Sequence, residues 1–207
     1  MRLIDALARL LALNQPAFRT GDAAVGLGVD RGHASKILER LAEAGHLLRL
    51  ARALWGVPGR LEPFALPEYL AAPFPAYVSL HSALFHHGMI SQVPSVIYAV
   101  TVGRACRHPT PLGLVSLHHV DPGFFFGFES HGRGALKIAT PEKALLDAFY
   151  LGTGRSRGLR ILPEIELPRA FSLRRARAIL AHIRSPARRR LVAARLDRLL
   201  SGQAVQG

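Results

Sequence analysis

The sequence predicts an α+β protein of two domains: a small N-terminal domain of three helices and a hairpin, and a larger mixed domain that ends in basic helices. Three observations favour this division. Apolar residues recur at helical spacing through most of the N-terminal part, prolines crowd the stretch 59–76, and runs rich in β-branched residues alternate with helical ones after it. We therefore expect domains at 1–58 and 77–207, joined by a proline-rich, semi-rigid connector at 59–76.

The composition favours a globular protein that meets a polyanion. The chain has 207 residues, of which 49% are hydrophobic and 20% charged, and its formal net charge is +13. The net charge is +3 over residues 1–58 (eight basic, five acidic), zero over 59–151 (six and six) and +10 over 152–207 (thirteen and three). Nucleic acid is the usual polyanion inside a cell, although an arginine-rich composition also follows from a GC-rich genome.

Cysteine usage and hydropathy indicate where the protein works. Cys106 is the single cysteine, so no internal disulfide can form and a reducing compartment is expected. Met1 is followed by Arg2 and an amphipathic run rather than by the apolar core of a signal peptide. No apolar stretch approaches the roughly 20 residues that span a bilayer. We expect a cytoplasmic protein that does not enter membranes.

The first two helices are predicted from apolar spacing and stop signals. Leucines recur at helical spacing over Arg2–Leu13, and Pro16 follows. Proline ends such a helix, because it lacks an N–H donor and disfavours the helical conformation in the residue before it. Thr20 is expected to be the N-cap of a short second helix that runs to Gly26. Gly28 then permits a tight turn.

A third helix and a hairpin complete the N-terminal domain. Asp30 is expected to cap a helix over Arg31–Ala44, and Gly45 ends it, where a left-handed residue is most often needed. Two short strands are expected at 47–50 and 54–57. The residues of the third helix that we expect to face inward are Ala34, Ile37, Leu38 and Leu41.

This order of elements is typical of a winged helix-turn-helix, in which the second helix of the motif lies in the major groove of DNA. Arg31 can bridge guanine, whereas Lys36 and Arg40 are placed for phosphates. The hairpin would reach the flanking backbone or the minor groove. The residues expected to bind DNA are Arg31, His33, Ser35, Lys36, Arg40, Arg49 and Arg52. The alternatives are an ordinary solvated helix face and a winged helix that binds protein.

The second domain is predicted to mix strands and helices. Ser79 is expected to cap a helix that ends at Gly88, and Thr140 with Pro141 opens another helix, with cap and proline in their preferred places. Gly152 to Arg155 is interpreted as the stop of that helix rather than as a phosphate-binding loop. The remaining expected elements are strands at 95–102, 113–120 and 136–139 and basic helices at 173–183 and 187–200.

Several segments of this domain resemble the AbiEi family of antitoxins. They are YVSLHSAL at 77–84, HGMI at 87–90, FFGF at 125–128 and IATPEKALLD at 138–147, and the resemblance covers residues 5–155 in matching order. The most specific segment is the last, and its motif residues are Thr140, Pro141, Glu142, Lys143 and Asp147. These motif residues either contact a partner or organise the domain core.

The resemblance implies an antitoxin of a type IV toxin–antitoxin system, linked to abortive infection of phage-infected bacteria. Its winged helix would repress the operon that encodes it. Its second domain would counteract a nucleotidyltransferase-like toxin, generally without a stable complex. The last fifty residues of this chain match the family only in being helical, which leaves the antitoxic surface open.

Arginines crowd the two C-terminal helices, and Asp197 is the one acidic residue among them. An ordinary solvated helix would mix the signs of its charges to form pairs. The excess therefore predicts a polyanionic partner: operator DNA, the RNA or nucleotide substrate of a toxin, or an acidic toxin surface. The expected partner surface comprises Arg174, Arg175, Arg177, Arg184, Arg188, Arg189 and Arg190.

Metal-binding and catalytic constellations are disfavoured. His81, His86 and His87 lack the i, i+4 spacing that would place two ligands on one helical face. A triad of Ser79 or Ser82, a histidine and Asp147 lacks the G-x-S-x-G elbow. We therefore expect no metal, no cofactor and no enzymatic activity.

The sequence thus predicts a DNA-binding autorepressor and antitoxin. The alternative is a stand-alone winged-helix regulator whose second domain binds a small molecule or a protein and which has no toxin. A nucleic-acid-modifying enzyme is the third class, and no acid–base or metal constellation supports it.

Overall fold

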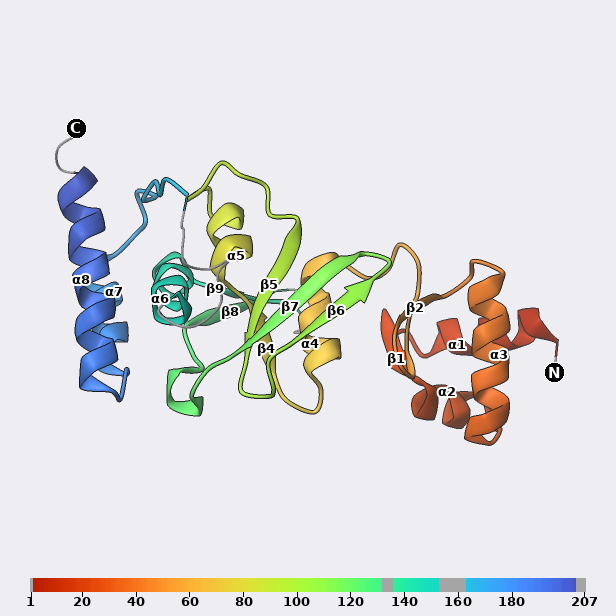
Figure 1. Ribbon diagram of the computed structural model, residues 1–207. Helices are drawn as coiled ribbons and strands as arrows, with labels where there is room; N and C mark the ends of the chain where they lie inside the picture. The colour runs from red at the N-terminus through yellow and green to blue at the C-terminus, as the bar shows by residue number, and fades with distance from the viewer. Residues whose placement is uncertain (1, 132–135, 153–162, 204–207) are drawn as a thin grey trace.

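The N-terminal unit of the computed structural model, residues 2–57, consists of three helices and a three-stranded sheet. The structure describes residues 2–131, 136–152 and 163–203 (Figure 1). The helices are α1 (Leu3–Ala12), α2 (Thr20–Leu27) and α3 (Arg31–Glu43), and the strands are β1 (Ala17–Arg19), β2 (Leu48–Ala51) and β3 (Leu54–Gly56). The strands pair antiparallel in the order β1-β3-β2.

The core of this unit forms where the three helices meet the sheet. Leu10 of α1, Leu27 of α2 and Leu38 and Leu41 of α3 are buried together with Trp55 of β3. The four residues of α3 that were predicted to face inward are all buried. The apolar face of α3 therefore packs on the sheet, and its polar face is left to solvent.

The caps of α3 are confirmed. The side chain of Asp30 accepts a hydrogen bond from the amide of His33 at 3.0 Å, as an N-cap does. Gly45 has φ of +77° just past the end of the helix, and Gly28 has φ of +68° in the turn before it. Both are left-handed conformations that glycine adopts without the steric cost of a Cβ.

The predicted cap of α2 is wrong. Thr20 lies inside the helix, and its Oγ1 accepts a hydrogen bond from Nε1 of Trp55 at 3.0 Å. Arg19 precedes the helix instead, and its amide donates to the Asp22 carboxylate at 2.9 Å. The reason is β1, which the sequence did not predict: it pairs with β3 up to Arg19, and this turns the Thr20 hydroxyl toward the core.

The stretch 59–76 is structured rather than a simple connector. It contains a 3₁₀ turn, η1 (Pro63–Ala65), and a helix, α4 (Leu66–Ala71). Pro63 and Pro67 stand in the first turns of these elements, where a missing N–H costs no hydrogen bond. Because Leu66 is fully buried, the stretch packs into the molecule.

A six-stranded mixed sheet forms the centre of the rest of the chain. Its strands are β4 (Ala76–Val78), β5 (Val96–Thr101), β6 (Cys106–Thr110), β7 (Gly113–His119), β8 (Phe128–His131) and β9 (Leu136–Ala139). They lie in the order β6-β7-β5-β4-β9-β8. The pairs β4–β9 and β5–β7 are parallel and the other three are antiparallel. The sequence predicted β5, β7 and β9 and missed the other three strands.

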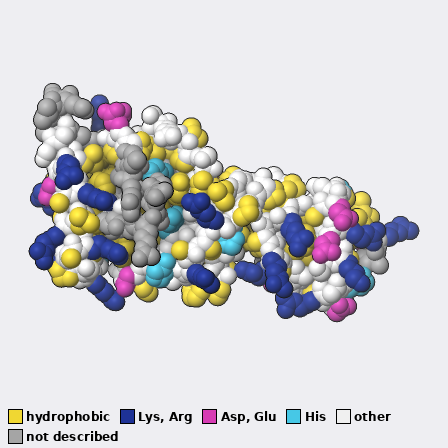
Figure 2. Space-filling view, viewed as in Figure 1, with side chains coloured by type: hydrophobic (Ala, Val, Ile, Leu, Met, Phe, Trp, Pro, Cys, Tyr) yellow, Lys and Arg dark blue, Asp and Glu magenta, His cyan; other side chains and the backbone are white. Residues whose placement is uncertain are grey.

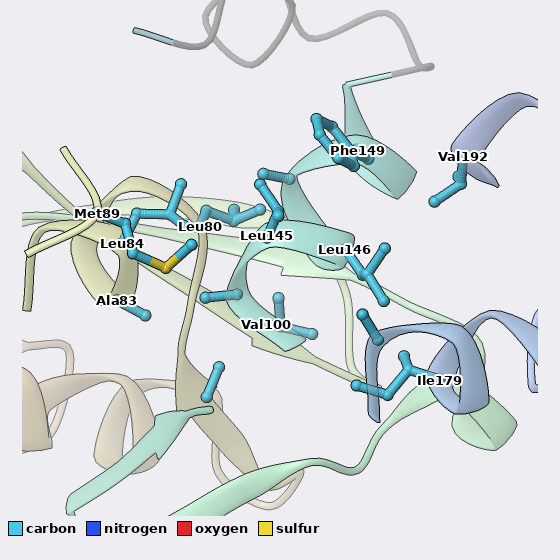
Figure 3. Close-up of a cluster of buried hydrophobic side chains, with 14 of the residues drawn as sticks. Leu80, Ala83, Leu84, Met89, Val100, Leu145, Leu146, Phe149, Ile179 and Val192 are labelled. Carbon is cyan, nitrogen blue, oxygen red and sulfur yellow. The ribbon is translucent and has the colours of Figure 1, made fainter. Parts of the chain in front are cut away.

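Helices cover one face of this sheet in two layers, and a 3₁₀ turn, η2 (Pro122–Phe124), lies between β7 and β8 in sequence. The helices α5 (Leu80–His86) and α6 (Pro141–Leu151) pack on the strands, and α7 (Leu173–Ala181) and α8 (Pro186–Gln203) pack on α6. Figure 3 shows the core that they share, where Leu145, Leu146 and Phe149 of α6 project among side chains of α5, β5, α7 and α8. Of the predicted stop of α6, residues 153–155 lie outside the described residues.

The other face of the sheet joins the two units. Ile97 and Ala99 of β5 point to this face, because successive side chains of a strand alternate. They are buried in one apolar cluster with Leu50 and Leu54 of the N-terminal hairpin and with Leu66 of α4. The hairpin of the N-terminal unit therefore packs at this face, where β2 contacts β6 and α4 covers neighbouring strands. The N-terminal unit lies at one end of the molecule, with α8 at the other end (Figure 1).

Candidate nucleic-acid interface

The exposed face of α3 carries most of the residues that were predicted to bind DNA. Arg31, His33, Lys36 and Arg40 are exposed, and Ser35 is half-buried. Among the described residues, none of the three cationic side chains on this face makes an ion pair. The Ser35 hydroxyl donates to Glu39 at 3.4 Å. The face therefore presents three cationic side chains that form no ion pair with a described carboxylate.

The start of α3 is capped by a carboxylate. The helix begins at Arg31, and the Asp30 carboxylate takes the amide of His33. This hydrogen bond holds the pKa of Asp30 below its ordinary value. Because a depressed pKa favours the charged form, the cap strengthens α3 at neutral pH and weakens as pH falls through the pKa of the folded state.

The hairpin carries the remaining two residues that were predicted to bind DNA. Arg49 of β2 is exposed, and its guanidinium lies over the Trp55 ring, 5.7 Å from the ring centroid. Arg52 is exposed in the turn between β2 and β3. Arg49 is thus oriented by a buried ring, whereas Arg52 stands free at the tip of the turn.

The predicted partner surface lies on α7, α8 and the turn between them, at the other end of the molecule (Figures 1 and 2). All seven of its arginines are exposed. Arg184 is 3.5 Å from the Asp121 carboxylate, and Arg188 stacks on the Tyr150 ring at 4.6 Å from its centroid. Neither contact buries the guanidinium, so each keeps donors for a partner.

The helices that carry this surface are anchored on α6. Arg195 of α8, itself half-buried, donates to the backbone carbonyl of Phe149 at 3.0 Å. The amide of Ser172, the residue that caps α7, donates to Glu142 Oε1 at 2.7 Å. The predicted motif therefore fixes where α7 begins.

The motif residues of α6 point into the core. Thr140 caps the helix by accepting from the amide of Lys143 at 3.4 Å, and Pro141 follows it as predicted. Glu142, Lys143 and Asp147 are at most 1% exposed. In this structure they organise the interior and do not reach a surface.

Lys143 and Asp147 form a buried ion pair inside a small polar network. Asp147 Oδ2 accepts from the Tyr77 hydroxyl at 2.9 Å and from the Ser79 hydroxyl at 2.7 Å. The ammonium of Lys143 also lies 3.8 Å from the centroid of the Phe124 ring. Burial lowers the pKa of Lys143 and, together with the charge of Asp147, raises the pKa of Tyr77.

The contacts of Ser79 and Asp147 correct the predicted cap of α5 and bear on the serine triad that the sequence disfavours. Ser79 precedes α5, but its hydroxyl makes no capping bond because it is committed to Asp147. Ser79 and Asp147 do meet, yet both are fully buried, and the Ser82 hydroxyl donates to the Val96 carbonyl instead. The sequence did not pair Tyr77 with Asp147. The two-residue spacing of Tyr77 and Ser79 was the available signal, since it puts both on one face of an extended chain.

The three histidines in and after α5 contact different groups. Nε2 of His87 is 2.7 Å from the Ala139 carbonyl, and the ring of His86 lies edge-on to that of His87 with centroids 5.0 Å apart. The ring of His81 is tilted against that of Tyr98, with centroids 5.3 Å apart. Within the described part of the chain, no group of three or more His, Cys, Asp or Glu side chains is arranged to hold a metal ion.

Comparison with known proteins gives one match. The family model described as "Transcriptional regulator, AbiEi antitoxin" matches residues 5–58, the range that α1, α2, α3 and the hairpin occupy. No curated protein matches the chain. None of the helices in the described ranges is long and apolar enough to cross a membrane. Residues 5–58 are thus similar to the AbiEi family of antitoxin transcriptional regulators, and the matched range is the N-terminal unit.

Proposed function

We propose that this protein is a transcriptional regulator whose N-terminal unit binds operator DNA as a winged helix-turn-helix. In this proposal α3 enters the major groove, and its exposed, unpaired cationic face is the observation that carries the assignment. Arg31, at the N-terminal end of α3, reads base edges, while Lys36 and Arg40 hold phosphates. The match of residues 5–58 to a regulator family supports this role.

The hairpin acts as the wing. Arg52, at its tip, contacts the DNA backbone or the minor groove beside the recognition helix. The Trp55 ring holds the guanidinium of Arg49, which lies on β2, the strand that precedes Arg52. His33 and Ser35, on the outer side of α3, complete the proposed contact surface.

The same proposal makes the protein an autorepressor and an antitoxin. It represses the operon that encodes it and counteracts a nucleotidyltransferase-like toxin of a type IV system in the cytoplasm, without a stable complex and without catalytic activity of its own. The exposed arginines of α7, α8 and their turn provide the partner surface, because seven guanidinium groups gather there and, among the described residues, one of them, that of Arg184, pairs with a carboxylate. Their partner is polyanionic.

Changing α3 tests the DNA-binding role. In the double variant R31A/K36A we expect affinity for the promoter fragment upstream of its own gene to fall by about 10- to 100-fold, because one base contact and one phosphate contact are lost. Fluorescence anisotropy against this fragment and a scrambled duplex, over a salt series, measures the change. The control R104A/R107A removes two exposed arginines of the second unit. Equal promoter affinity in the two variants would refute α3 as the interface.

Changing α8 tests the partner surface. In R189Q/R190Q we expect the slope of log affinity against log salt concentration, measured on a scrambled duplex, to shrink by about 1.8, because two phosphate contacts disappear. The control R104Q/R107Q removes the same charge elsewhere and should leave the slope nearly unchanged. A normal slope in R189Q/R190Q would show that these arginines do not meet nucleic-acid phosphates and would direct the search to an acidic protein surface.

The second candidate function is a stand-alone regulator whose activity depends on a small molecule. One observation favours it: a groove of about 660 Å³ opens between the N-terminal unit and the sheet. A regulator without a toxin would need another role for its second unit. A small molecule bound in this groove would provide that role.

A further inference from the structure

A groove lies where the N-terminal unit meets the six-stranded sheet. Its volume is about 660 Å³, and the space-filling view shows that the molecule narrows at this junction (Figure 2). Arg60, Leu61 and Glu62 line it from the segment after β3, and Tyr69, His131 and Leu136 line it from α4, β8 and β9. Pockets for small molecules commonly measure about 300–1,000 Å³ and often lie at the junction of domains.

The inner wall of the groove is apolar and well ordered by packing. Leu61 is 7% exposed and belongs to the apolar cluster that joins the two units. Tyr69 and Leu136 are half-buried beside it. Burial raises the pKa of Tyr69, so its phenol stays neutral at physiological pH and can donate a hydrogen bond. This wall suits the apolar body of a small ligand.

The rim of the groove carries, among the described residues, one cationic and one anionic side chain, those of Arg60 and Glu62. Arg60 is exposed, and its guanidinium donates a long hydrogen bond, 3.5 Å, to the Leu11 carbonyl. Among the described residues Arg60 makes no ion pair. Its guanidinium therefore keeps a fork of donors that matches a carboxylate.

We propose that this groove binds a small organic anion, an aromatic or branched aliphatic carboxylate. The carboxylate meets the Arg60 guanidinium, and the apolar body lies on Leu61 and Leu136 with Tyr69 beside it. A cation is disfavoured because the unpaired guanidinium of Arg60 stands on the rim.

Ligand in this groove would touch both units at once. Gln15 and Pro16 line it from the segment before β1, and the Pro16 carbonyl accepts from the amide of Val57, which follows β3. Arg60 lies three residues beyond Val57, so its position depends on the same end of the N-terminal sheet. An anion that binds one relative placement of the two units more tightly than another shifts the protein toward that placement. The affinity for the operator changes with this shift. This consequence rests on the proposed DNA-binding function, but binding itself does not.

Binding is tested without DNA, on the full chain, with 1-anilinonaphthalene-8-sulfonate as a fluorescent aromatic anion. We expect saturable binding that weakens about tenfold in Arg60→Gln, because the charged partner of the sulfonate is lost. Arg104→Gln removes the same charge outside the groove and should bind normally. Unchanged binding in Arg60→Gln, or a loss in R189Q/R190Q instead, would overturn the groove as the site.

Competition tests the chemical class. Benzoate is expected to displace the probe, and benzylamine, which has a similar body and the opposite charge, is expected not to. The reverse order would refute an anion site. A second variant, Leu136→Glu, places a carboxylate on the apolar wall and should also abolish probe binding while thermal unfolding stays cooperative. Because no operator is present, failure of these measurements leaves the DNA-binding proposal untouched.

Discussion

Replacing Asp147 with alanine is expected to destabilise the protein by about 3–5 kcal/mol, because the change strands the buried ammonium of Lys143. The side chains of both residues are 0% exposed. The hydroxyls of Tyr77 and Ser79 would also lose their acceptor. The aromatic face of Phe124 offers Lys143 some compensation, but a ring cannot replace a carboxylate in the interior. Urea unfolding followed by circular dichroism measures the loss.

The matched control removes both charges. In K143M/D147L no ion is left unpaired, so we expect a smaller loss than in Asp147→Ala, since apolar residues of similar volume often replace a buried pair at little cost. If the double variant were less stable than the single one, the pair itself would stabilise the fold. A normal Asp147→Ala protein would contradict the burial of this network.

Replacing Trp55 with alanine is expected to destabilise the N-terminal unit by about 3–5 kcal/mol, because a large aromatic side chain leaves a cavity in its core. Trp55 is 2% exposed and packs against all three helices. The change also removes the support of Arg49, so operator binding should weaken with stability. Thermal unfolding followed by circular dichroism measures the effect.

Two milder changes separate packing from hydrogen bonding. Trp55→Phe keeps most of the ring but loses the hydrogen bond to Thr20, and we expect a clearly smaller loss than for alanine. Thr20→Val keeps the ring and strands the indole N–H, which should cost about 1–3 kcal/mol. If Thr20→Val were neutral, the bond between α2 and β3 would not hold the hairpin in place.

Three helices could be predicted closely because their signals are local. α1, α3 and α6 each combine apolar residues at helical spacing with a stop or a cap: Pro16 after α1, Asp30 before α3 and Thr140 before α6. A cap needs a side chain and an amide three residues apart, so neighbouring residues decide it. The same periodicity predicts which side of α3 is exposed. It therefore predicted the candidate DNA-binding residues of this helix.

Short strands were missed because their reasons lie far away in the chain. β1 has three residues and exists only because it pairs with β3, some 35 positions later. β8 likewise depends on β9. A strand of this length has almost no intrinsic preference, and hydrogen bonds to a partner decide it. The wrong cap at Thr20 is a consequence of the missed β1.

The sequence by itself determined α1, α3 and α6, the two charged ends and a resemblance to the AbiEi family that was carried by segments of the second domain. Tertiary structure decided what the polar residues do. Ser79 and Asp147 are 68 positions apart, and only the meeting of α5 and α6 turns a predicted cap and a motif carboxylate into one buried network. The groove at Arg60 likewise exists only because the sheet and α4 pack against the N-terminal unit. Local spacing fixes which residues share a face, whereas burial and partnership depend on which faces the folded chain brings together.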